Sequence, residues 1–217
     1  MKPYNPSTKI LLVILALALA ALGCLKQKTQ IDPRNFSIDQ CSCPGMALTF
    51  IEGTSSASNN TYLTTIPGFD DNIEIKGRLT CVWQEEYQSD QKVGLISANL
   101  EVVRIQEEAQ AKALYKQYKE QVVPKPDYCE EDNHCYVREY DAGPERIMYA
   151  EQNTYSGDQG EDLPSYHNAH LVMNIYGPND HYVVNLTVSH PELDPGSNYV
   201  IDKAAAIEAC LQPLAGK

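Results

Sequence analysis

The chain has 217 residues and a formal net charge of −12, with 29 acidic residues against 17 basic ones. A surface with this excess of negative charge repels the phosphate backbone of nucleic acids and anionic lipid headgroups. We therefore expect no nucleic acid among its partners. The length is sufficient for one domain with a substantial core, or for two small ones.

The first segment has the layout of a secretory signal. Lys2 and Lys9 precede an unbroken apolar run of 13 residues, Ile10 to Leu22, which is followed by Gly23 and Cys24. As a helix this run would be about 20 Å long, whereas a hydrocarbon core of about 30 Å needs roughly 20 residues. A basic start, a short apolar run and a small residue at its end are typical of a signal peptide.

The end of the run, Ala21-Leu22-Gly23-Cys24, resembles the lipobox of prokaryotic membrane lipoproteins. Gly23 and Cys24 match that pattern. Ala21 and Leu22 depart from it, because leucine usually stands three positions before the cysteine and a small residue two before. The resemblance implies that the signal is removed, that the Cys24 thiol carries a lipid, and that the membrane is a partner through this anchor. An uncleaved N-terminal anchor, or ordinary secretion with Cys24 as one more thiol, are the alternatives. All three place residues 25–217 outside the cytoplasm, and the first places them at the extracytoplasmic face of the cell membrane.

Seven cysteines are present, and assigning Cys24 to the lipid leaves six for disulfides: Cys41, Cys43, Cys81, Cys129, Cys135 and Cys210. An even number in an exported chain indicates a disulfide framework. Cys41 and Cys43 are separated by one residue and are poorly placed to bond to each other. Cys129 and Cys135 flank a short polar loop that they could close locally. In that case Cys41 and Cys43 would bond to the two remaining cysteines, in one order or the other.

A metal-handling or thiol-redox surface protein using Cys41, Cys43 and His134 is the alternative interpretation of these cysteines. Thiolates select copper or zinc. The C-x2-C spacing of zinc sites is absent, however, and an oxidising location favours disulfides. We therefore expect no metal site and no cofactor.

The whole chain is predicted to comprise a signal peptide at 1–23, a lipid-anchored tether at 24–40 and a single domain at 41–217. The tether mixes Lys, Gln, Asp, Pro and Asn with little periodicity, which is typical of a linker. Residues 53–60 and 153–167 are predicted to be polar loops. Strands are predicted over 46–52, 61–66, 73–83, 93–105, 135–140, 145–152, 169–176 and 182–189.

Strict alternation in the 73–83 strand predicts one core face, made of Ile73, Ile75, Gly77, Leu79, Cys81 and Trp83. Alternation in the 182–189 strand likewise predicts a core face of Tyr182, Val184, Leu186 and Val188.

Two helices are predicted. The first covers about 106–122, with an apolar stripe formed by Ile105, Ala109, Ala113, Leu114, Tyr118 and Val122. Glu108 and Lys112 would form an i,i+4 ion pair on it. The second helix follows Ser197 and buries Val200, Ala204, Ile207 and Leu211.

Strands, a helix, four strands and a helix predict the α+β class, an antiparallel sheet with two packed helices bridged by disulfides. This element order, over roughly residues 73–212, is similar to that of the extrinsic photosystem II lumenal protein (PsbP-like) fold. It is also similar to that of small lipoprotein sensor domains of bacterial kinase receptors. A shared fold does not carry function.

No G-x-S-x-G, G-x-G-x-x-G, phosphate-loop or H-E-x-x-H motif occurs in the chain. We therefore predict no catalytic residue and favour a non-catalytic module that binds a protein partner or small ligand. A hydrolase with a site assembled from distant residues, for example His167 or His190 beside a nucleophile, stays open.

The remaining histidines and the glycosylation motifs are weak signals. In a strand, His167 and His170 would point to opposite faces. His134, His181 and His190 fall at loops or strand ends, where we expect solvated side chains. The N-glycosylation pattern is matched at Asn35, Asn59 and Asn185.

Overall fold

The computed structural model describes residues 31–32, 34–43, 55–88, 93–122, 138–141, 145–153, 166–191 and 199–215. All strand pairs are antiparallel and form one eight-stranded sheet in the order β1-β3-β4-β8-β7-β6-β5, with β2 also paired to β3. The strands are β1 (Ser56–Ser58), β2 (Tyr62–Thr64), β3 (Ile73–Gln88), β4 (Val93–Ile105), β5 (Arg138–Asp141), β6 (Arg146–Asn153), β7 (Tyr166–Tyr176) and β8 (His181–His190). The helices are η1 (Ile38–Cys41), α2 (Glu108–Val122), α3 (Tyr199–Leu211) and η3 (Gln212–Ala215), of which η1 and η3 are short 3-10 helices.

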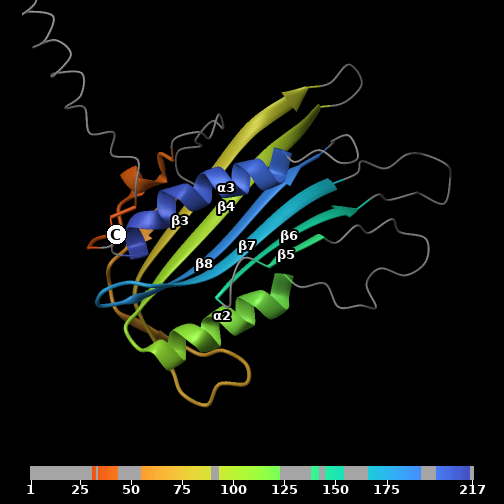
Figure 1. Cartoon of the computed structure of the whole chain (residues 1–217). Coiled ribbons are helices and arrows are strands. Elements are labelled where there is room, and N and C mark those ends of the chain that lie inside the picture. Colours follow the sequence, from red (N-terminus) through yellow and green to blue (C-terminus); the bar gives the residue numbers. More distant parts are fainter. Residues whose placement is uncertain are drawn as a thin grey trace, which may run out of the picture.

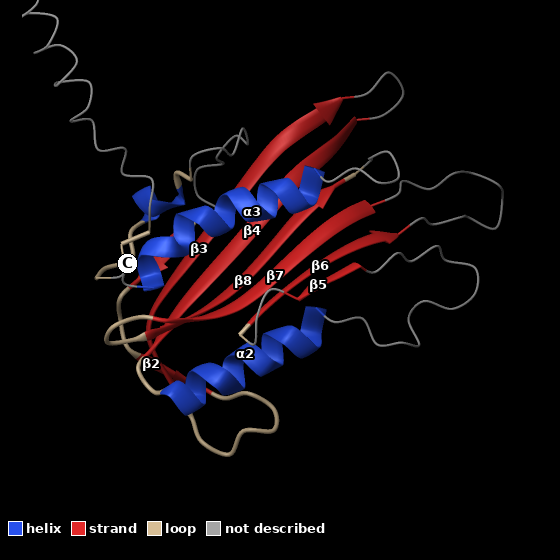
Figure 2. Ribbon diagram, in the orientation of Figure 1, coloured by secondary structure: helices blue, strands red, loops and turns tan. Residues whose placement is uncertain are grey.

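Helices α2 and α3 cover opposite faces of the sheet. Figures 1 and 2 show α3 crossing the strands above and α2 running below them. Two separate hydrophobic cores lie between the sheet and these helices. The predicted class, an α+β domain with an antiparallel sheet, two packed helices and disulfides, is confirmed.

The core under α3 contains the side chains that alternation in β8 predicted. These four residues are fully or almost fully buried against the apolar side of the helix. The strand contributes Tyr182, Val184, Leu186 and Val188, and the helix contributes Val200, Ala204, Ile207 and Leu211.

The core under α2 agrees with the predicted stripe except at one residue. The helix begins at Glu108, and its buried residues are Ala111, Leu114 and Tyr115, whereas Ala109 is exposed. The other five predicted residues lie in this core or pack against it: Ile105, Ala113, Leu114, Tyr118 and Val122. The Lys112 Nζ–Glu108 Oε1 ion pair is present at 2.5 Å.

A β-bulge at Lys76 divides the predicted single face of β3. Ile75 lies opposite Ile105 and Gly77 lies opposite Arg104, so Lys76 has no partner of its own on β4. An extra residue of this kind shifts the alternation by one position. As a result Ile73 and Ile75 enter the core under α2, while Leu79, Cys81 and Trp83 enter the core under α3. The prediction of one continuous face was wrong for this reason.

Other boundaries differ modestly. Strand β1 lies within residues 53–60, which the sequence suggested were a loop. The predicted hairpin near residue 140 is confirmed by the pairing of β5 with β6. The predicted strand at 46–52 lies outside the described residues.

Candidate functional site

The N-terminal segment, residues 31–32 and 34–43, packs against the domain. The Ile31 side chain is fully buried and that of Phe36 is 4% exposed. The Ile31 backbone N–H donates a 3.2 Å hydrogen bond to the carbonyl oxygen of Cys210 at the end of α3. The later half of the stretch predicted as tether is therefore part of the packed structure, and residues 24–30 lie outside the described residues.

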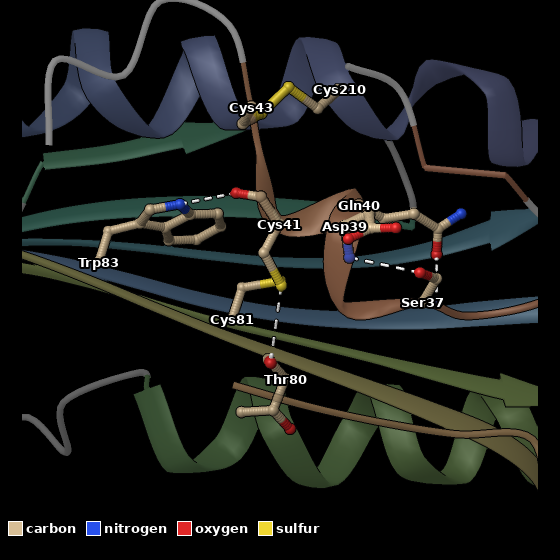
Figure 3. Close-up of a disulfide and its surroundings, with 9 residues drawn as sticks. All are labelled: Ser37, Asp39, Gln40, Cys41, Cys43, Thr80, Cys81, Trp83 and Cys210. Atoms are coloured by element: carbon tan, nitrogen blue, oxygen red, sulfur yellow. Dashed lines mark hydrogen bonds between the residues drawn. A yellow bond between two sulfur atoms is a disulfide. The ribbon is translucent and has the colours of Figure 1, made fainter. Parts of the chain in front are cut away.

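Two disulfides hold this segment to the sheet and to α3. Cys41 bonds to Cys81 on β3, with 5.4 Å between the Cα atoms, and Cys43 bonds to Cys210 on α3, with 6.1 Å. Figure 3 shows Cys43–Cys210 at the helix and Cys41–Cys81 below it, directed to the sheet. Of the two pairings that the sequence left open, this is the one that the structure contains.

Short-range hydrogen bonds shape the turn that presents these cysteines. The Ser37 backbone N–H donates to Gln40 Oε1 at 2.8 Å, and the Asp39 backbone N–H donates to Ser37 Oγ at 3.3 Å. This reciprocal arrangement is a capping box at the start of η1. Trp83 Nε1 then donates a buried 2.7 Å hydrogen bond to the carbonyl oxygen of Cys41 (Figure 3). The turn is thus held internally and from the sheet.

Arg104 and Asn59 hold the middle of the segment. Arg104 Nη1 donates to the carbonyl oxygen of Arg34 at 3.1 Å and Nη2 donates to that of Lys76 at 2.9 Å. The guanidinium carbon lies 5.5 Å from the centre of the Phe36 ring. The Asn59 amide accepts from the Phe36 N–H at 2.9 Å and donates to the Phe36 carbonyl at 3.0 Å. The segment therefore has a fixed course across β3 and β4.

Electrostatic effects are clearest at Asp32 and at two tyrosines. Side-chain and backbone hydrogen bonds from Arg34 lower the pKa of Asp32 to about 2. Burial raises the pKa of Tyr182 to about 12. Burial, followed by the charge of Glu101 and a hydrogen bond to it, raises the pKa of Tyr118. Neither tyrosine is therefore a source of phenolate at neutral pH.

Two of the three residues considered for a metal or redox site are cross-linked to other parts of the domain. Cys41 and Cys43 are both in disulfides, and a disulfide sulfur has no thiolate to offer. His134 lies outside the described residues, as do Cys24, Cys129 and Cys135. Within the part of the chain that the structure describes, no group of three or more His, Cys, Asp or Glu side chains is arranged to hold a metal ion.

The histidines of β7 and β8 divide between the two faces of the sheet. His167 lies opposite His190, and they are 5% and 3% exposed. The expectation of a solvated His190 was wrong, although parity with Tyr182 and Val188 on the same strand could have shown it. His170 points to the other face, as predicted, with Nδ1 3.0 Å from Thr187 Oγ1.

The three glycosylation motifs occupy different settings. Asn35 is exposed. The Asn59 amide is engaged on both sides by the backbone of Phe36. Asn185 lies within β8, between β4 and β7, and its Oδ1 is buried. Asn35 is therefore the best placed of the three to carry a glycan on the folded domain.

The chain has little similarity to known proteins in sequence or in structure. No protein-family profile matches the chain, and no curated protein matches it. Among solved structures, the chain is similar to the crystal structure of LpqN, described as involved in cell envelope biogenesis of Mycobacterium tuberculosis, with 13% identity and a TM-score of 0.30. The similarity covers 81% of this chain and 96% of that one. At this TM-score the similarity does not indicate a shared function. Among the described residues, no helix is long and apolar enough to cross a membrane.

Proposed function

We propose that this protein is an extracytoplasmic lipoprotein, held at the membrane by a lipid on Cys24, whose domain is a non-catalytic binding module. The observation that carries the proposal is the pair of disulfides at Cys41 and Cys43. Such bonds persist in oxidising compartments and are rare where glutathione and thioredoxin keep thiols reduced. They support export, which the apolar leader at Ile10 to Leu22 would direct.

The position of the bridges also suits a domain attached at its N-terminal side. Both bridges lie within 20 residues of Cys24 and connect the segment to β3 and α3. A cross-linked attachment point keeps the domain folded while its anchor moves with the membrane.

One surface supports a binding role. Helix α2 packs against one face of the sheet, and the surface is the part of that face that the helix does not cover. Most side chains of this polar face are amide, hydroxyl or imidazole groups that are half-buried or exposed: Gln84, Ser97, Asn99, Asn168, His170, Thr187 and Ser189. The same face also carries the apolar side chains of Val82 and Leu95 and the carboxylate of Glu86. Hydrogen-bonding groups beside apolar side chains fit a neutral, hydroxyl-rich ligand, such as a polysaccharide of the cell surface.

Intact mass of the protein extracted from native membranes tests localisation and anchoring together. We expect a chain that begins at Cys24, carries a diacylglycerol-containing modification and contains at least two disulfides. Cys24→Ala should remove the lipid and release the domain from the membrane while leaving both bridges formed. A full-length, unmodified chain with reduced thiols in the cytosol would contradict the proposal.

The ligand class is tested separately, with neutral oligosaccharides added to the detergent-solubilised protein. We expect NMR shift changes at residues of the polar face, weakened by Asn99→Ala and unchanged by Asn35→Ala, which alters an exposed asparagine on the N-terminal segment. Shift changes located elsewhere, or none at all, would reject a glycan as the ligand without affecting the anchoring result.

A further inference from the structure

The buried histidine pair under α3 is a feature that the proposed function does not use. His167 and His190 lie directly opposite each other on adjacent antiparallel strands, on the face that α3 covers. Side chains in such a pair have Cβ atoms about 4.5–5.5 Å apart. Two imidazoles at that separation can approach one ion from two sides.

The surroundings of the pair are mostly apolar. Val188 and Ala169, the next residues along the same face, are fully buried. The Tyr199 ring meets the His190 ring edge-on, with 5.1 Å between centroids. Lys203 Nζ lies 5.4 Å from the centre of the Tyr199 ring on its own helix. Burial, and secondarily the charge of Glu85 on β3, raises the pKa of Tyr199. The tyrosine therefore has one charged residue of each sign in its surroundings, Lys203 and Glu85.

The number of donors limits which ion this site can take. No third His, Cys, Asp or Glu groups with the pair among the described residues, whereas structural zinc takes four ligands. The cost of burying an ion rises with the square of its charge, so a monovalent ion costs about a quarter as much as a divalent one. Imidazole is a good ligand for copper, and monovalent d10 ions accept two ligands in a near-linear arrangement.

We propose that His167 and His190 form a two-coordinate site for a monovalent d10 metal ion, Cu(I) or its redox-inert analogue Ag(I). The site is distinct from the Cys41, Cys43 and His134 set, since two of those residues are in disulfides. The site is on the opposite side of the sheet from the proposed glycan face, and neither proposal depends on the other.

Ag(I) nitrate is the probe of choice, because it needs no reductant that would open the disulfides. It is titrated into the full-length, detergent-solubilised protein in chloride-free buffer, after free thiols have been alkylated. We expect one equivalent to bind, with a two-nitrogen first shell in X-ray absorption. Loss of an outer-shell partner already costs about 10–100-fold in metal affinity, so His167→Ala or His190→Ala should weaken binding at least that much. His170→Ala is the matched control, since it removes a histidine of the same strand from the opposite face, and it should leave binding unchanged.

Three results would overturn the proposal. The first is no stoichiometric binding of Ag(I) or Cu(I) to the wild-type protein, a measurement that does not depend on any variant folding. The second is a sulfur first shell, or equal loss with His170→Ala. The third is tighter binding of Zn(II) than of Ag(I) with the same histidine dependence, because that would require donors beyond the pair. Lys203→Met should strengthen binding, because it removes the cation that lies over the Tyr199 ring beside His190.

Discussion

Trp83 Nε1 donates a 2.7 Å hydrogen bond to the carbonyl oxygen of Cys41, the residue that is also bonded through sulfur to Cys81. Trp83 and Cys81 stand two residues apart on the same face of β3. The strand therefore holds Cys41 at two points, one covalent and one through the backbone carbonyl. Both contacts are buried, so each has a consequence for stability that can be measured.

Replacing Trp83 with phenylalanine removes one of the two donors to the Cys41 carbonyl oxygen, which keeps the 3.1 Å hydrogen bond from the Cys43 backbone N–H. A hydrogen bond contributes about 0.5–1.5 kcal/mol net, and the smaller ring adds a packing loss. We expect the free energy of unfolding in urea to fall by at least that much, with both disulfides intact. Leu63→Ala, at a side chain that is 64% exposed, should change it by less than about 0.5 kcal/mol. Equal effects of the two variants would contradict this account.

The two disulfides should open in a defined order under mild reduction of the folded protein. Cys41 and Cys81 are 1% and 0% exposed, whereas Cys43 is only partly buried. Thiol–disulfide exchange requires access of the attacking thiolate to a sulfur atom. We expect Cys43–Cys210 to be reduced first, as followed by alkylation and peptide mass mapping. In denaturant the difference should disappear, and faster opening of Cys41–Cys81 in the folded state would refute the prediction.

Asp32 should titrate well below an ordinary aspartate. Hydrogen bonds from Arg34 lower its pKa to about 2 from 3.8. The stabilisation that accompanies this lowered pKa is fully present above about pH 3.8 and is lost as the pH falls through about 2. Because the Arg34 and Asp32 side chains are 84% and 42% exposed, solvent screening keeps this contribution small. Carboxyl NMR should show the low midpoint in the wild type and a midpoint near 3.8 in Arg34→Gln. A wild-type midpoint near 3.8 would show that the pair does not persist in solution.

Deletion of Lys76 tests the division of β3 between two cores. Without the extra residue, Ile75 would still lie opposite Ile105 and Gly77 opposite Arg104, now in regular alternation. Ile73 and Ile75 would therefore stay on the α2 side, and Leu79 and Cys81 on the α3 side. We expect the deletion variant to unfold cooperatively by circular dichroism and to form the Cys41–Cys81 bridge. Lys76→Ala keeps the bulge and removes only the ion pair with Glu74, so it should remain folded. A deletion variant that does not fold would contradict this account, in which the bulge only sets the face that each residue takes.

Most of the strands and both long helices could be predicted from the sequence. Apolar residues alternate in β4 and β8, and in α3 they recur every three or four positions. These patterns predicted two strands and a helix, because a half-buried strand or helix repeats its apolar residues with its own period. The face presented by α2 was predicted except at Ala109, since Ala109 and Ala111 are equally apolar and only the neighbouring strands decide which is covered.

The candidate sites were less predictable. An even set of cysteines indicated bridges, but whether Cys41 bonds to Cys81 or to Cys210 depends on where β3 and α3 lie relative to one turn of η1. Parity along β8 puts His190 on the core side of the sheet, but only the tertiary structure places Tyr199 of α3 against it.

Composition and local periodicity determined, from the sequence alone, that this chain forms an antiparallel sheet with two helices and carries cysteines suited to an oxidising compartment. Both follow from interactions between residues near each other in the chain, or from simple counts. Tertiary structure alone decided the bulge at Lys76, the pairing of the disulfides and the meeting of His167 with His190. Each of these depends on the register between segments distant in sequence, and that register is set by the packing of the whole domain.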